Sequence, residues 1–173
     1  MFLSIQEMEL RAVRFDETFP PGQVDFADAG VRQISPLHAA GRAELLANTD
    51  GEVRIRGDFT VEMGCECDRC LGPARFPLAG SFDLFYRPMS TIAREEEIEI
   101  DEGEAEIAFY EGGGMELEDV LREQVLLALP MQRTCREQCR GICPVCGVNR
   151  NETPCDCRPQ SSDDRWNALR DLQ

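Results

Sequence analysis

Glu52-Val-Arg-Ile-Arg-Gly-Asp-Phe-Thr-Val-Glu-Met63 alternates apolar and polar residues almost throughout its length. Successive side chains of a strand point to opposite faces of a sheet, so residues two apart share a face. The segment therefore predicts a strand with one buried face, and Gly57 within it predicts a bulge. The apolar residues of the same parity are Val53, Ile55, Phe59, Val61 and Met63.

Further strands are predicted on both sides of this one. Met8–Phe15 and Gly41–Ala47 precede it, and Asp50-Gly51 supplies the residues of a hairpin turn. Phe76–Tyr86 follows, with alternate apolar residues on one face. We therefore expect a β-rich N-terminal domain, barrel-like or a sandwich.

One long helix is predicted after Gly112-Gly-Gly114, over about residues 115–129, where apolar residues recur at helical spacing. Acidic residues begin it and Pro130 ends it. We expect this helix to pack on the sheet and close a domain of residues 1–130. A cysteine-rich tail, residues 131–173, would follow and end in a short amphipathic helix from Ser161. The expected class is α+β.

An acidic run lies between the strands and the helix. Arg94 to Glu106 contains eight carboxylates, with Ile98 and Ile100 alternating among them. The run fits a solvated loop that includes an edge strand protected by charge, or a segment that contacts a basic partner.

Composition narrows the function classes. The chain has 173 residues, a formal net charge of −15, and 18 basic residues that are all Arg. So acidic a chain is repelled by nucleic-acid backbones over most of its surface and attracts basic partners such as ribosomal proteins. No apolar run approaches the ~20 residues of a membrane span, and no signal-peptide pattern begins the chain. We expect a cytoplasmic protein without a membrane or a small-molecule partner.

Six cysteines within the tail predict a metal site: Cys135, Cys139, Cys143, Cys146, Cys155 and Cys157. Cys143-Pro-Val-Cys146-Gly147 has the form of a knuckle that holds zinc from a tight turn, in which Gly147 would adopt a positive φ. Structural Zn²⁺ is thus the expected cofactor. Six thiols exceed one tetrahedral ion, and the spacing leaves open which four bind and whether there are one or two ions.

A second thiol group, Cys67 and Cys70, follows the strongest strand. These two could share an ion with the tail cysteines, form a pair of their own, or act in redox chemistry. A redox pair belongs at the start of a helix in a βαβ unit, which neither Cys-x2-Cys site offers. Catalytic zinc normally involves His, and the single histidine, His38, is far from the cysteines in sequence. We expect no enzyme.

The tail is the least acidic part of the chain. Arginines outnumber acids between residues 131 and 158, and four thiolates around one zinc cancel the excess. These arginines are solvated surface residues or contacts to phosphates or bases of RNA. The possible RNA contacts are Arg133, Arg136, Arg140 and Arg150.

Taken together, these motifs resemble the YceD family of large ribosomal RNA subunit accumulation proteins. The resemblance rests on Cys67-x-Arg69-Cys70-Leu71, on Leu-Ala-Leu-Pro130, and on the run from Cys139 to Cys157. The closing Asp163-Asp-Arg165-Trp166 also fits, with Asp164 in place of the family's proline, and Arg150 stands where members have Leu. The resemblance implies a role in accumulation or processing of 23S rRNA, with zinc that stabilises the tail.

The expected function is therefore a ribosome biogenesis factor that acts by binding. Its partners would be a large ribosomal subunit precursor, ribosomal proteins or 23S rRNA. Two other classes stay open: a cytosolic thiol-disulfide oxidoreductase that uses the Cys-x2-Cys pairs, and a zinc-dependent transcription regulator. The charge of −15 argues against the regulator.

Overall fold

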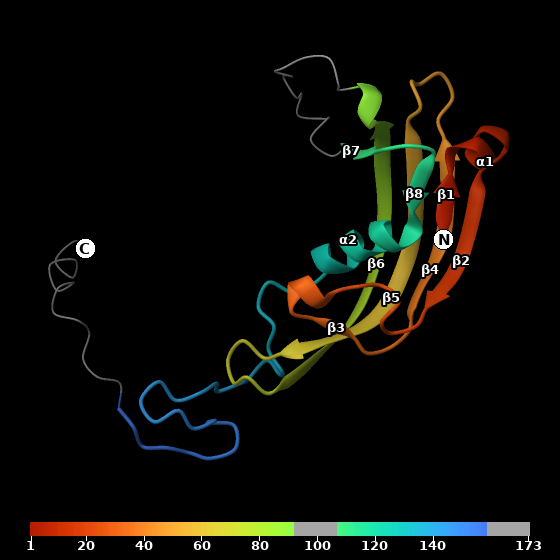
Figure 1. Cartoon of the computed structure of the whole chain (residues 1–173). Coiled ribbons are helices and arrows are strands. Elements are labelled where there is room, and N and C mark those ends of the chain that lie inside the picture. Colours follow the sequence, from red (N-terminus) through yellow and green to blue (C-terminus); the bar gives the residue numbers. More distant parts are fainter. Residues whose placement is uncertain (92–106, 159–173) are drawn as a thin grey trace, which may run out of the picture. The chain divides into compact units, whose positions relative to one another are not determined.

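The computed structural model describes residues 1–91 and 107–158 (Figure 1). The expected edge strand near Ile98 and the helix expected from Ser161 lie outside these ranges. The chain divides into two compact units. The sheet unit is Met1–Cys65 with Arg75–Met131, and the cysteine unit is Glu66–Ala74 with Gln132–Gln173. The domain division expected at residue 130 stays a prediction.

A six-stranded sheet forms the larger part of the sheet unit. Neighbouring strands follow the order β2-β4-β5-β6-β7. β3 pairs with the end of β5 that extends beyond β4. β2, β3, β4 and β5 are paired antiparallel, whereas β7 is parallel to β6. Among the described residues the strand order ends at β2 and β7, so this sheet is open and is not a barrel. The strands are β2 (Val13–Phe19), β3 (Arg32–Gln33), β4 (Leu37–Leu45), β5 (Val53–Glu66), β6 (Pro73–Pro88) and β7 (Ile107–Tyr110).

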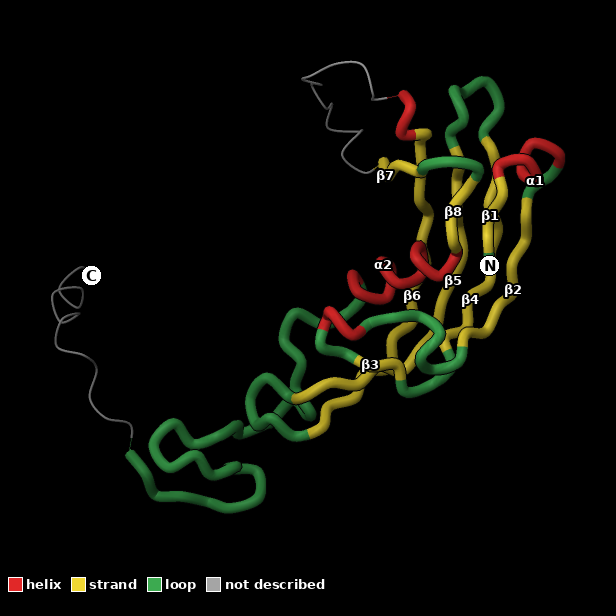
Figure 2. The backbone as a smooth tube through the Cα atoms, viewed as in Figure 1, coloured by secondary structure: helices red, strands yellow, loops and turns green. Residues whose placement is uncertain are grey.

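A smaller layer covers one face of this sheet. β1 (Phe2–Ser4) pairs antiparallel with β8 (Gly114–Glu116), and the packing helix α2 (Leu117–Leu127) follows β8 directly. Figure 2 shows this layer in front of the large sheet, together with the short helix α1 (Ile5–Leu10). Two 3-10 turns, Ala27–Ala29 and Met89–Thr91, complete the described elements. None of the helices in the described ranges is long and apolar enough to cross a membrane.

The core lies between these two layers. All five apolar residues of one parity in β5 are buried, as the alternation predicts. Opposite them, Leu117, Val120, Leu121 and Val125 of α2 are buried, and Leu3 of β1 is fully buried. Each such side chain contributes about 1.5–3 kcal/mol by leaving water. The α+β class and the single packing helix are thus confirmed.

Two local predictions are wrong. Residues 8–10 belong to α1 and not to a strand, because Ile5 and Met8 place apolar side chains one helical turn apart and Met8 is buried. Gly57 is not a bulge in the β4–β5 pairing, where the register runs without a break from His38↔Thr60 to Leu45↔Val53.

Candidate metal centres

Eight cysteines of the cysteine unit form two groups of four. We call Cys67, Cys70, Cys135 and Cys139 site 1, and Cys143, Cys146, Cys155 and Cys157 site 2. In each group the four Sγ atoms lie within 4.8 Å of one another. Cys65 is buried and lies in neither group.

The spacing in site 1 fits a four-coordinate metal. The Sγ atoms of Cys67 and Cys139 are 3.8 Å apart, and those of Cys70 and Cys135 are 3.7 Å apart. A zinc ion with Zn–S distances of about 2.3 Å places its sulfurs about 3.8 Å apart at the corners of a tetrahedron. Both measured edges match this value, so site 1 is positioned to hold such an ion.

A tight turn between β5 and β6 presents the first two thiols of site 1. The Leu71 N–H donates to the Cys67 carbonyl at 2.9 Å, and the Cys67 N–H donates to the Gly72 carbonyl at 2.8 Å. Leu71 has a φ of 59°, a left-handed conformation that few non-glycine residues adopt. This conformation closes the turn and directs both thiols of Cys67-Asp-Arg-Cys70 to one point.

Backbone N–H groups prepare Cys67 as a thiolate ligand. Burial alone raises the pKa of the Cys67 thiol, but N–H groups of Cys135, Arg69 and Cys70 outweigh it and lower the pKa to about 6. The Cys135 N–H lies 3.3 Å from the Cys67 sulfur. Burial and the neighbouring Cys70 thiol raise the pKa of Cys135 to about 12. A bound cation would stabilise the thiolate form of Cys135 against these effects, and metal binding would release its proton.

Asn151 contacts a cysteine of site 1 through its side chain. Its Nδ2 donates to the Cys139 sulfur at 3.3 Å and to Asn149 Oδ1 at 2.9 Å. Its Oδ1 accepts the Arg140 N–H at 2.9 Å and Nη2 of Arg136 at 2.8 Å. Asn151 lies in the chain between the two halves of site 2, so its side chain links the segment that carries site 2 to Cys139 of site 1.

Site 2 is built on the knuckle that the sequence predicts. The Gly147 N–H donates to the Cys143 carbonyl at 2.9 Å, and Gly147 has the expected positive φ, 73°. The N–H groups of Cys146 and Val145 lower the pKa of the Cys143 thiol to about 6. Cys155 and Cys157 reach the group from a loop without regular secondary structure. Site 2 is more exposed than site 1, since Cys146 and Cys157 are both exposed.

The arginines singled out in the tail differ in their surroundings. Arg133 lies with its Nε 3.8 Å from a carboxylate oxygen of Asp68, and Arg136 donates to Asn151. Arg140 and Arg150 are exposed. Their role as rRNA contacts stays a prediction. His38 is an exposed residue of β4 whose Nε2 lies 2.9 Å from Asp16 Oδ1.

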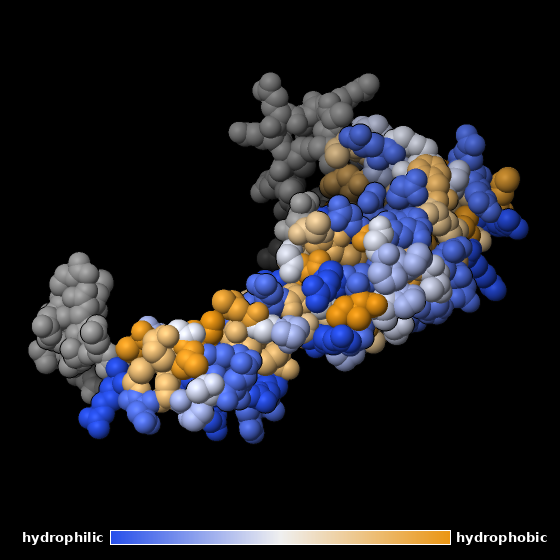
Figure 3. Space-filling view, turned by 60° about the horizontal axis from the view of Figure 1, so that its bottom comes forward, coloured by the Kyte–Doolittle hydropathy of each residue, from blue (hydrophilic) through white to orange (hydrophobic). Residues whose placement is uncertain are grey.

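Sequence reasoning missed the residues that support the thiols. Asn149 and Asn151 form the network around Cys139, and two asparagines inside a cysteine cluster were the available signal. Two large apolar side chains of the cysteine unit are also exposed, Leu71 by 61% and Val145 by 54%. Figure 3 shows apolar surface alternating with polar surface over this unit. The apolar spacing patterns that locate buried residues in a sequence do not predict that these two side chains are exposed.

Comparisons with known proteins agree with the motifs. Residues 55–173 match the family model described as "Large ribosomal RNA subunit accumulation protein YceD". The YlbN protein of Bacillus subtilis is 25% identical over 171 residues, which are 97% of this chain and 92% of that protein. A protein of Mycobacterium tuberculosis is 34% identical over 118 residues, 68% of this chain and 54% of that protein.

A plant relative carries a functional name. The "Large ribosomal RNA subunit accumulation protein YCED homolog 1, chloroplastic" of Zea mays is 24% identical over 179 residues, 84% of this chain and 60% of that protein. The chain thus spans only a little over half the length of the mycobacterial and maize relatives. No solved structure matches the chain significantly. The family match covers more than half of the chain, and on this ground the chain belongs to the YceD family of large ribosomal RNA subunit accumulation proteins.

Proposed function

We propose that this chain is a cytoplasmic ribosome biogenesis factor needed for accumulation or processing of 23S rRNA, and that it acts by binding. The observation that carries the proposal is the family match over residues 55–173, together with the name of the maize relative. The chain would bind a large-subunit precursor through ribosomal proteins, through 23S rRNA, or through both. No small-molecule substrate or catalytic residue enters the proposal.

The metal in this account is structural Zn²⁺, one ion at each site. Groups of four thiolates are typical ligands of structural zinc, and the tail has few apolar side chains with which to form a hydrophobic core. Among residues 132–158 the structure has no helix or named strand, so ordinary packing supplies little stability there. Structural zinc contributes on the order of 10 kcal/mol in small peptides. We therefore assign the eight cysteines of sites 1 and 2 to holding the tail in one conformation.

Charge supports a division of labour. The net charge of −15 favours contact between the acidic surface and basic proteins. The exposed arginines of the tail, Arg136, Arg140 and Arg150, would contact phosphates of rRNA. The tail would thus touch RNA, while acidic surface elsewhere in the chain would face a ribosomal protein.

One observation favours a second candidate, a thiol-disulfide oxidoreductase. Cys67 and Cys143 each begin a Cys-x2-Cys pair, and hydrogen bonds lower the pKa of both thiols to about 6. Thiolates at neutral pH are nucleophiles. Both are also buried within groups of four cysteines, however, which is the arrangement of a metal ligand. Disulfide exchange by the metal-loaded protein, lost in Cys67→Ser or Cys143→Ser without unfolding, would establish this alternative.

The proposal is tested by sedimentation. Tagged full-length protein from gently lysed cells is run through a sucrose gradient, and crosslinked partners are identified by mass spectrometry. We expect migration with large-subunit precursors and crosslinks to ribosomal proteins or 23S rRNA. A Cys70→Ser/Cys143→Ser variant, which damages both sites, should shift to the top of the gradient. Wild-type protein found only at the top, without ribosomal crosslinks, would overturn the proposal.

A further inference from the structure

Three arginines face one another across neighbouring strands of the sheet unit. Arg14 of β2 pairs with Arg42 of β4, and Arg42 pairs with Arg56 of β5. We call these three residues the arginine row. Like charges directly opposite each other in a sheet are destabilising. The row therefore costs stability, and another role must account for it.

The arginine row is poorly neutralised, although the chain is strongly acidic. Within residues 1–91 and 107–158, Arg42 has one ion pair, to Glu44 at 3.1 Å, while Arg14 and Arg56 have none. Elsewhere in the sheet unit arginines do find carboxylates, as Arg54 does at Asp83. In addition, Nε of Arg42 is buried and has no hydrogen-bond partner in the described part of the chain. A buried donor without a partner is unusual, and Arg42 must change rotamer to present it to an external acceptor.

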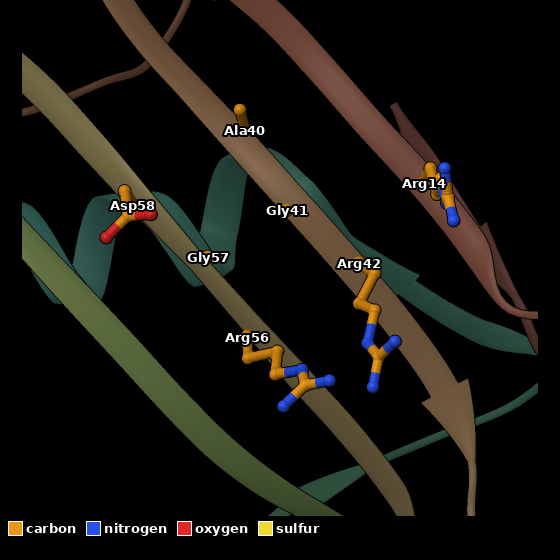
Figure 4. Close-up of a pocket in the computed structure, with 7 residues that line it drawn as sticks. All are labelled: Arg14, Ala40, Gly41, Arg42, Arg56, Gly57 and Asp58. Atoms are coloured by element: carbon orange, nitrogen blue, oxygen red, sulfur yellow. The ribbon is translucent and has the colours of Figure 1, made fainter.

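A hollow accompanies the row on the face of the sheet that points away from the core. Its volume is about 360 Å³. The small side chain of Ala40 and the backbone of Gly41 and Gly57 line this space between the arginines. Figure 4 shows Arg42 and Arg56 extending in the same direction from adjacent strands, with Asp58 turned away from their guanidinium groups.

We propose that the arginine row and its hollow bind phosphate groups of an RNA backbone. A guanidinium group pairs with phosphate through two parallel hydrogen bonds, and it is always charged. Neighbouring strands lie about 4.8 Å apart, so the row spans about 10 Å and can reach more than one phosphate of a strand. Successive phosphates of an RNA strand would offset the arginine charges that oppose one another and would supply acceptors for Arg42, which has an unpartnered donor.

The inference rests on the proposed function for its choice of RNA, but it places the contact at a site separate in sequence from the tail arginines. It also agrees with the net charge. A chain of −15 repels phosphate in general, so RNA binding requires a local cluster of unpaired cations. An acidic protein segment is the competing partner, because a carboxylate also pairs with a guanidinium group through two hydrogen bonds, and the test below separates the two partners.

The test uses full-length, metal-loaded protein and a fluorescein-labelled single-stranded RNA of about 20 nucleotides, with anisotropy read at 50 and 200 mM salt. The row variant should bind at least about tenfold more weakly at 50 mM salt, and its salt slope should fall by about 2, as expected for three lost contacts to single strands. A matched control removes three ion-paired arginines and changes the net charge equally. The row variant is Arg14→Gln/Arg42→Gln/Arg56→Gln, and the control is Arg11→Gln/Arg54→Gln/Arg75→Gln.

Two further readouts separate binding from folding. Asp58→Asn removes a carboxylate from the edge of the hollow and should tighten RNA binding, which no unfolding effect can mimic. The row variant should also melt at the same or a higher temperature than wild type in low salt, because repulsion within the row is relieved. A melting temperature well below wild type would contradict the claim that the row costs stability.

Other outcomes overturn the proposal. Equal loss of RNA binding in the row variant and in the matched control would reduce the effect to net charge. Unchanged RNA binding with loss of crosslinks to a protein would assign the row to an acidic protein segment. Sedimentation distinguishes failure of this inference from failure of the proposed function. If wild type migrates with large-subunit precursors and the row variant binds RNA normally, the phosphate site is overturned. The proposed function then stays in place.

Discussion

Gly41 of β4 and Gly57 of β5 face each other so closely that neither position has room for a Cβ atom. A Cβ on Gly41 would lie 2.3 Å from the Arg56 carbonyl oxygen and 2.6 Å from Cζ of Phe15. A Cβ on Gly57 would lie 2.5 Å from the Ala40 carbonyl oxygen. The pair thus lets β4 and β5 approach each other at this point, on the face of the sheet that carries Phe15 and opposite the arginine row.

Gly41→Ala should destabilise the chain by about 2 kcal/mol or more, because the atoms in the way are backbone and a buried ring that cannot move freely. Urea unfolding followed by far-UV circular dichroism measures the loss. Gly113→Ala is the control, since a Cβ there meets nothing within 4 Å. Equal stability of the two variants would show that the strands can separate at no cost.

Asn151→Ala should weaken metal binding at site 1 by about 10- to 100-fold, the usual effect of removing an outer-shell hydrogen bond. The variant loses the donor to the Cys139 sulfur and the acceptor for the Arg140 N–H. Competition with a chromophoric chelator measures the affinity. Thr153→Ala, an exposed change in the same loop, should leave it unaltered, and an Asn151 variant with wild-type affinity would contradict the assigned role.

The ion pair between Arg54 and Asp83 predicts a dependence of stability on acid. Hydrogen bonds from Arg54 lower the pKa of Asp83 in the folded chain. A lowered folded-state pKa stabilises the fold above the unfolded value of about 3.9, and this stabilisation disappears as the pH falls through the folded-state pKa. Asp83→Asn should therefore lower the melting temperature of the sheet at pH 7 and have no effect near pH 2.

Glu17→Gln provides the control for that comparison, because Glu17 is exposed on β2 and has no ion pair within the described ranges. It should leave the melting temperature unchanged at both pH values. A difference between wild type and Asp83→Asn that persists at pH 2 would show that the effect does not come from the charged pair.

The sequence predicted the sheet most accurately at β5, where the alternation of apolar and polar residues is longest. The parity of β5 fixed which face is buried, because a shift by one residue would have exposed Ile55 and Met63. The same reasoning failed at Met8, since a six-residue helix gives too short a pattern to separate from a strand. β3 is only two residues long and leaves no pattern at all.

The sequence predicts that the cysteines form a metal site, but it does not predict how they are grouped. Cysteine spacing identified the knuckle at Gly147, because the turn is local. The partnership of Cys67 and Cys70 with Cys135 and Cys139 joins segments more than 60 residues apart, and spacing along the chain leaves that pairing as one option among several. The arginine row needed the strand register, which sets Arg14, Arg42 and Arg56 opposite one another.

The most direct test of the account is a count of metal ions by native mass spectrometry on protein purified without added metal. We predict two zinc ions per chain, one after Cys70→Ser, one after Cys143→Ser, and two after Cys65→Ala, which lies outside both groups. A wild-type chain with one ion or none, or a Cys70→Ser variant that keeps both, would contradict the two four-cysteine sites on which the tail is built.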